Sequence, residues 1–196
     1  MSETTAAVSE IVHVAGPHVG PLLTQVEQRL LEIAGDSGPV LSDHATGTMK
    51  AGGKRLRPLL VVLAAGGTDG AGVVRGAVAV ELVHAATLVH DDVLDVSGPA
   101  ERTGKHRGTD LLDGTVTLPF ILARARDPSL EAPAGMTPEE AEAVCDRIAA
   151  TGALQDSRAR ALELVAQGKA SLPDGLPATQ RRALDLVADS VVARYA

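Results

Sequence analysis

Three aspartates, Asp91, Asp92 and Asp95, form a DDxxD motif at the end of a long apolar segment. On a helix, Asp91 and Asp95 are one turn apart and share a face. Their mutual repulsion calls for a cation, and carboxylates suit Mg²⁺, which keeps water and substrate phosphate oxygens among its ligands. The alternative is an acidic helix end exposed to solvent. Because negative charge at a helix C-terminus opposes the helix dipole, the motif favours a site for Mg²⁺ and a diphosphate.

A basic turn lies upstream of this motif. Lys54, Arg55 and Arg57 follow two glycines and surround the start of an apolar run that contains Pro58. Backbone N–H groups at the start of a helix point outward, and together with the cations they could hold a diphosphate. The alternative is a basic turn on the surface. A basic turn and an acidic helix end in one chain favour diphosphate binding more than either does alone.

Further side chains could face the same ligand. His84 lies seven residues before Asp91, which is two helical turns away on nearly the same face. Taken alone, a histidine at this position is also typical of a helical core. Lys105, ten residues after Asp95, could fold back over a metal-bound diphosphate, as could Arg102 or Arg107. For each of these three cations the alternative is a solvated loop side chain.

The elements that must position these residues are all helical in pattern. The apolar spacing, the prolines and the glycine breaks predict helices over residues 20–34, from Pro58 onward, over residues 72–96, from Leu118 and Pro119 onward, and over residues 138–151, 154–169 and 178–194. The segment 72–96 is apolar nearly all round, which predicts a buried helix. No segment predicts a strand, so the expected fold class is an all-α helical bundle.

Composition limits the classes of function. The 196 residues suffice for one domain, and with one Phe, one Tyr and no Trp the core must be built from Ala, Leu and Val. The net charge of -7 argues against a nucleic-acid partner or a polybasic membrane-surface protein. Cys145 is the only cysteine, which excludes an intrachain disulfide and favours a cytoplasmic location. From the sequence we expect that no apolar stretch reaches the length of a membrane span, and hence that the chain has no transmembrane segment.

Several motifs resemble one protein family in order and spacing. The stretches GGKRLRPLL and VELVHAATLVHDDVLD resemble the isopentenyl-diphosphate cradle and the first aspartate-rich motif of trans-polyprenyl diphosphate synthases. The stretch DDVLDVSGPAERTGKHRGTDLLDGTVTLP resembles the second aspartate-rich motif of that family and the segment that follows it, and the tail resembles its closing helices. The resemblance therefore covers nearly the whole chain.

The resemblance also implies that the middle of the family fold is missing. A full-length member carries two DDxxD motifs with several helices between them, whereas here one DDVLD serves both positions. We interpret this as an internal deletion. After such a deletion we expect a single truncated polyprenyl synthetase domain over residues 1–196, with an N-terminal half over 1–95 and a C-terminal part over 96–196. Its fold would be a shortened isoprenoid-synthase bundle.

By the same resemblance, the site residues take family roles. The reaction is the Mg²⁺-dependent condensation of isopentenyl diphosphate with an allylic prenyl diphosphate. The diphosphate of isopentenyl diphosphate would be bound by Lys54, Arg57 and His84. Mg²⁺ would be bound by the motif aspartates, chiefly Asp91 and Asp95 with Asp92 beside them, and the allylic diphosphate by Lys105. Product length would be set at Ala86 and Thr87, whose small side chains imply a long product.

Departures from the family pattern leave alternatives to full activity. Ala100 and Glu101 replace the paired arginines that usually follow the first motif, and the second aspartate-rich motif is absent. With one carboxylate cluster instead of two, we expect weak or no turnover. The chain could instead be a non-catalytic helical subunit that pairs with an intact synthase, or an inactive remnant. Association as a homodimer or with a full-length synthase is expected from the apolar faces left by the deletion.

Overall fold

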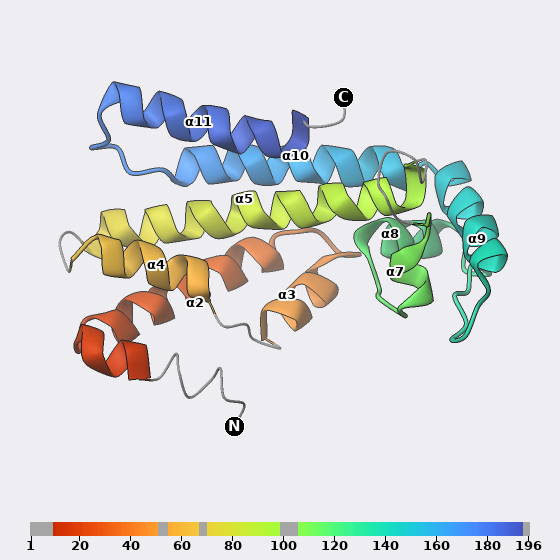
Figure 1. The fold of residues 1–196 in the computed structure, drawn as a ribbon, viewed down its shortest axis with the longest axis horizontal. Helices are drawn as coiled ribbons and strands as arrows, with labels where there is room; N and C mark the ends of the chain where they lie inside the picture. Colours follow the sequence, from red (N-terminus) through yellow and green to blue (C-terminus); the bar gives the residue numbers. More distant parts are fainter. Residues whose placement is uncertain (1–9, 51–54, 67–69, 99–105, 194–196) are drawn as a thin grey trace. The chain divides into compact units, whose positions relative to one another are not determined.

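The computed structural model describes residues 10–50, 55–66, 70–98 and 106–193. These residues form helices and connecting turns, and none of them is in a strand, which confirms the all-α class (Figure 1). In chain order the helices are α2 Val19–Gly35, α3 Ser42–Lys50, α4 Leu56–Ala64, α5 Gly70–Ser97, α7 Thr109–Leu112, α8 Leu118–Arg126, α9 Pro138–Ala150, α10 Ala153–Ser171 and α11 Ala178–Ala193.

The chain divides into two compact units. The first combines Met1–Val83 with Ala166–Ala188, and the second combines His84–Val165 with Asp189–Ala196. Helices α5 and α10 each contribute residues to both units. The single domain expected over residues 1–196 stays a prediction.

In the first unit, α2 packs against α3 and α4. The apolar stripe predicted over residues 20–34 becomes the buried face of α2, and its neighbours in the core come from α4 and α5. The buried members of this cluster are Val19, Leu22, Leu59, Val62 and Val73. Pro58 lies in the first turn of α4, where a missing N–H costs no helical hydrogen bond, as the sequence predicted.

Small residues bring α5 and α10 close together in the first unit. A Cβ placed on Gly168 would lie 3.0 Å from Val83 Cγ2 and 3.3 Å from the carbonyl oxygen of Ala79. Beside this contact, the guanidinium of Arg75 donates to Asp174 Oδ2 at 2.6 Å and to the carbonyl oxygen of Leu172 at 2.8 Å. The α10 C-terminus is therefore fixed to α5 by close packing and by one arginine.

The second unit is built around α9, which contacts α7 and α8. Its start is fixed by a reciprocal pair of hydrogen bonds between Thr137 and Glu140, the arrangement that most strongly defines a helix N-terminus. Gly108 has a φ of +79° and packs against Cys145 and Ala141. The buried members of the core are Val93, Val96, Leu111, Phe120, Ala123, Leu130, Ala141, Cys145, Ile148, Ala153 and Leu154.

Helix α5 corrects two expectations. By length and composition it is apolar enough to cross a membrane, so the expectation that no stretch reaches this length is wrong on that criterion. Only 33% of the most apolar 18-residue stretch of this helix is buried within the structure, so the helix is less buried than its sequence predicted. Core helices of soluble proteins meet the same criterion of length and composition, so this finding gives weak support to membrane insertion.

Candidate functional site

The DDxxD motif occupies the last two turns of α5, in the second unit. Asp91 is exposed, whereas Asp92 and Asp95 are half-buried. The three carboxylates therefore lie at the same end of one helix but differ in their exposure to solvent.

Asp95 binds the backbone at the start of α7. Its Oδ1 accepts a hydrogen bond from the N–H of Thr109 at 3.1 Å, and its Oδ2 accepts one from the N–H of Asp110 at 3.2 Å. The carbonyl oxygen of Asp95 also accepts a hydrogen bond from the N–H of Gly108 at 3.0 Å. The first N–H groups of a helix have no partner within it, so Asp95 satisfies two groups that α7 leaves open.

Asp92 lies near the start of α8. Its Oδ2 accepts a hydrogen bond from the N–H of Leu118 at 3.4 Å. The pKa of Asp92 is raised to about 6, chiefly by burial and also by the nearby carboxylates of Asp110, Asp91 and Asp95, against the bond from Leu118, which lowers it. Asp92 therefore holds its proton more tightly than an exposed aspartate does.

Arg107 ties the end of α5 to α9. Its Nε donates to the carbonyl oxygen of Val96, and its Nη1 donates to Asp146 Oδ1 at 2.7 Å. The sequence predicted that this cation could fold over a diphosphate. In the structure its guanidinium is instead engaged by the protein.

The basic turn belongs to the first unit. Arg55, at the start of α4, has a φ of +44° and donates to the carbonyl oxygen of Met49 at 3.1 Å and to Glu27 Oε1 at 3.4 Å. Its guanidinium therefore joins α4 to α2 and to the end of α3. Arg57 is exposed on the first turn of α4, and Lys54 lies outside the described residues.

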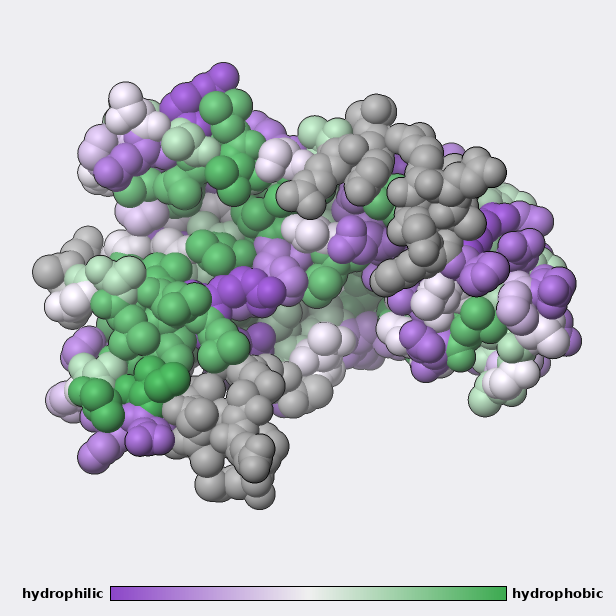
Figure 2. All heavy atoms as spheres, in the orientation of Figure 1, coloured by the Kyte–Doolittle hydropathy of each residue, from purple (hydrophilic) through white to green (hydrophobic). Residues whose placement is uncertain are grey.

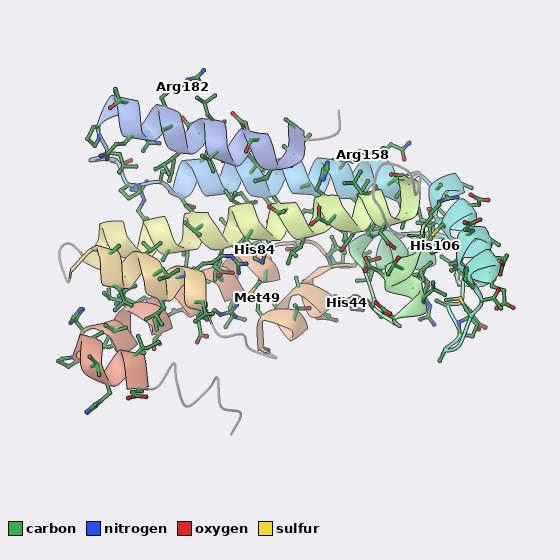
Figure 3. The ribbon with its side chains drawn as sticks, in the orientation of Figure 1. His44, Met49, His84, His106, Arg158 and Arg182 are labelled. Atoms are coloured by element: carbon green, nitrogen blue, oxygen red, sulfur yellow. The ribbon has the colours of Figure 1, made fainter. Side chains whose placement is uncertain are left out.

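The remaining candidates fall in different units or outside the described residues. His84 is half-buried on α5, in the second unit (Figure 3), whereas Arg57 belongs to the first unit. Lys105 lies outside the described residues. Ala86 is fully buried and Thr87 half-buried on the same helix as the motif. Their roles in substrate binding and in product length stay predictions.

The three motif aspartates do not form a metal site as placed. In the part of the chain that the structure describes, no group of three or more His, Cys, Asp or Glu side chains is arranged to hold a metal ion. Both oxygens of Asp95 and one oxygen of Asp92 also accept backbone N–H groups, which leaves them fewer lone pairs for an ion. The donor set predicted for Mg²⁺ therefore does not fit a three-carboxylate site here.

Comparison with a family model supports part of the resemblance found in the sequence. Residues 39–98, which include the basic turn and the DDxxD motif, match the sequence model of the polyprenyl synthetase family. The resemblance seen in the motifs is thus confirmed, and this segment carries it.

Two curated relatives are similar in sequence to parts of this chain. The chain is 44% identical over 78 residues to a prenyl transferase of Porphyra purpurea, covering 37% of this chain and 24% of the relative. It is 46% identical over 76 residues to heptaprenyl diphosphate synthase component 2 of Geobacillus stearothermophilus, covering 37% and 23%. The chain therefore spans about a quarter of the length of these curated relatives.

A solved structure supports the fold. The polyprenyl synthase of Caulobacter crescentus CB15, crystallised with calcium and isoprenyl diphosphate, superposes with a TM-score of 0.62 at 24% identity. The match covers 95% of this chain and 62% of that chain. The fold of this chain is therefore similar to part of the all-α fold of that protein.

Proposed function

We propose that the chain is a polyprenyl diphosphate synthase-like prenyltransferase that condenses isopentenyl diphosphate with an allylic prenyl diphosphate. The match of residues 39–98 to the polyprenyl synthetase family carries this proposal. That segment contains both the stretch GGKRLRPLL and the stretch DDVLD, so it holds the cationic and the anionic residues together. The reaction would be part of isoprenoid biosynthesis.

The substrate contacts proposed are those of cations with diphosphate oxygens. Arg57 is exposed at the start of α4, where a guanidinium can bind two oxygens of one phosphate. Lys54, His84 and Lys105 complete the proposed set. Cations of this kind stabilise the charge that develops on a leaving diphosphate, which is the largest demand of the reaction.

Mg²⁺ is the proposed cofactor on the chemistry of the carboxylates. Asp91 is the exposed member of the motif, and Asp92 and Asp95 are bonded to backbone N–H groups. Because the full donor set does not fit an ion as placed, we expect weak binding of Mg²⁺ and slow turnover. A cytoplasmic location and a long product stay predictions from the sequence.

Turnover by the purified chain tests the proposal. We expect labelled isopentenyl diphosphate and Mg²⁺ to extend farnesyl or geranylgeranyl diphosphate slowly. Arg57→Ala and Asp91→Ala should each lower the rate by about tenfold or more, because each removes a charge on the substrate side. The matched control is Arg158→Ala, which removes an exposed arginine from α10 (Figure 3).

The outcomes separate the readings. Product formed by the wild-type chain and by Arg158→Ala, but lost in Arg57→Ala and Asp91→Ala, supports the proposal. No product from the wild-type chain alone contradicts the proposal. If the chain also leaves the rate and product length of an added intact synthase unchanged, it is an inactive remnant. If it changes either of them, the result favours the non-catalytic subunit.

We further propose that the chain associates with a second polypeptide of the same family or with its own copy. Hydrophobic side chains gather on the surface over α4 (Figure 2). Among them, Leu56, Leu60 and Leu63 are exposed by 44%, 65% and 36%. Exposed apolar surface of this kind marks interaction sites. One similar protein is named as component 2 of a synthase, which supports association between chains.

A further inference from the structure

We infer that the aspartate-rich motif is divided by role, with Asp95 and Asp92 positioning α7 and α8 and only Asp91 left for a ligand. The inference concerns the folded chain without substrate, and it does not depend on the proposed transferase activity. It changes the expected set of metal ligands from three carboxylates to one.

Neither α7 nor α8 begins with a side-chain cap of its own. The residue before α7 is Gly108, which has no side chain to offer. The residue before α8 is Thr117, a buried residue whose hydroxyl makes no cap hydrogen bond within the described residues. Each of these helix starts is therefore dependent on a group from elsewhere for its open N–H groups.

Asp92 and Asp95 of the motif, which lie earlier in the sequence, supply the acceptors for these N–H groups. Asp95 binds the first two N–H groups of α7, at Thr109 and Asp110, with one oxygen on each. Asp92 binds the first N–H of α8, at Leu118, through a longer bond of 3.4 Å. A carboxylate also interacts favourably with the positive end of a helix, although α7 is short and this effect is small.

Two neighbouring bonds hold the same segment against the end of α5. The N–H of Gly108 donates to the carbonyl oxygen of Asp95, and Arg107 donates to the carbonyl oxygen of Val96. Asp95 therefore holds the segment through its side chain and its backbone at once. A cation bound to the Asp95 carboxylate would draw negative charge from the oxygens that accept these N–H bonds and weaken them, so capping and metal binding oppose each other.

Amide hydrogen exchange on the full chain without metal tests the inference. Replacement of Asp95 by Ala should speed exchange at the amides of Thr109 and Asp110 by about tenfold or more, because both lose a charged acceptor. Asp95→Asn keeps one acceptor oxygen and should give an intermediate effect. Asp91→Ala, an exposed position on the same helix, is the matched control and should leave both amides unchanged.

A second measurement on the wild-type chain covers the case in which Asp95→Ala fails to fold. If Asp95 is a cap, millimolar Mg²⁺ should leave exchange at Thr109 and Asp110 unchanged. Exchange that rises and saturates as Mg²⁺ is added would show Asp95 to be a metal ligand and overturn the inference. Equal effects of Asp91→Ala and Asp95→Ala on the two amides would overturn it as well.

Discussion

Asp91, Asp92 and Asp95 are close in sequence but differ in what surrounds them. The motif predicts three carboxylates that face one cation, because the spacing places Asp91 and Asp95 on one helical face. The structure brings N–H donors from residues 109, 110 and 118 to Asp95 and Asp92. These partners lie 14 to 26 residues further along the chain. Helix spacing alone could not predict them, because they depend on the path of the connecting segment.

The raised pKa of Asp92 predicts a pH dependence of stability. In the unfolded chain its pKa is near the ordinary 3.8, whereas in the folded chain burial raises it to about 6. Between these values the folded state holds a proton that the unfolded state releases. The contribution of Asp92 is therefore fully present below about pH 4 and is lost as pH rises through about 6.

Asp92→Asn removes this charge and keeps an acceptor oxygen for Leu118. We expect it to raise the free energy of unfolding by about 1 to 2 kcal/mol at pH 7.5, discounted for solvent screening, and much less at pH 4. Urea unfolding of both proteins at the two pH values, with a chelator present, measures this. The control Asp113→Asn changes an exposed carboxylate and should show no such difference. An equal effect of Asp92→Asn at both pH values would contradict the assignment.

The basic side chains show the same limit of sequence reasoning. Lys54, Arg55 and Arg57 were grouped because they are consecutive or nearly so. Arg55 is instead bonded to Glu27 and to the carbonyl oxygen of Met49. Charge in a sequence motif can be predicted, but the partner of a long flexible side chain depends on tertiary packing.

At the scale of elements, helix positions were largely predictable. The expected helices over 20–34, 138–151, 154–169 and 178–194 agree with α2, α9, α10 and α11 to within one or two residues. Their apolar spacing and their proline or glycine boundaries carry that information.

Two short helices were missed. Helix α3 buries none of its residues and contains Gly47. Its threonine hydroxyls bond to its own backbone, as Thr46 and Thr48 do. Helix α7 has only four residues. Neither has an apolar face long enough to produce a helical period, so both depend on contacts made after folding.

The turn before α7 depends on a glycine for two separate reasons. Gly108 has a φ of +79°, and a Cβ there would lie 3.1 Å from Cys145 Sγ and 3.2 Å from Ala141 Cβ. Gly108→Ala should therefore lower the free energy of unfolding by about 2 to 3 kcal/mol, from backbone strain and from overpacking of the core. Urea unfolding monitored by circular dichroism measures the loss.

Gly114→Ala is the matched control for this effect. Gly114 has a similar φ of +70°, and a Cβ there would meet no heavy atom of the described residues within 4 Å. It should cost about 1 kcal/mol from strain alone. Equal losses in the two variants would show that the contact with Cys145 and Ala141 carries no energy.

At the scale of the whole molecule, the exposed face of α4 predicts association. Leu60 is 65% exposed, and Leu56 and Leu63 lie one turn away on either side. Leu60→Lys should weaken self-association by about tenfold or more, because it places a charge in an apolar contact. Sedimentation velocity over a range of protein concentrations measures this.

A control distinguishes association through this face from non-specific association through any exposed apolar side chain. Leu162 on α10 is 57% exposed, so Leu162→Lys adds the same charge at similar exposure elsewhere. It should leave association unchanged. A wild-type chain that stays monomeric at every concentration, alone and with an intact synthase, would rule out α4 as an interface.

The division into two units was not visible in the sequence. One of its boundaries falls within α5, between Val83 and His84, where the apolar pattern continues without a break. Sequence patterns indicate where helices begin and end, but a division inside a helix depends on which neighbours each turn contacts. The all-α class could therefore be predicted, whereas the grouping of its helices could not.

The composition of the first unit has a consequence for translation, because its two segments are separated in the sequence by residues 84–165. Residues 84–165 must be translated before Ala166–Ala188 can join Met1–Val83. At typical rates of 5–20 residues per second this interval is roughly 4–16 s. During it, Arg75 has no carbonyl of the α10 end to bind, and the surface of α5 around Ala79 and Val83 has no Gly168 against it. The nascent chain therefore exposes this surface to chaperones and proteases until Ala166–Ala188 has been translated.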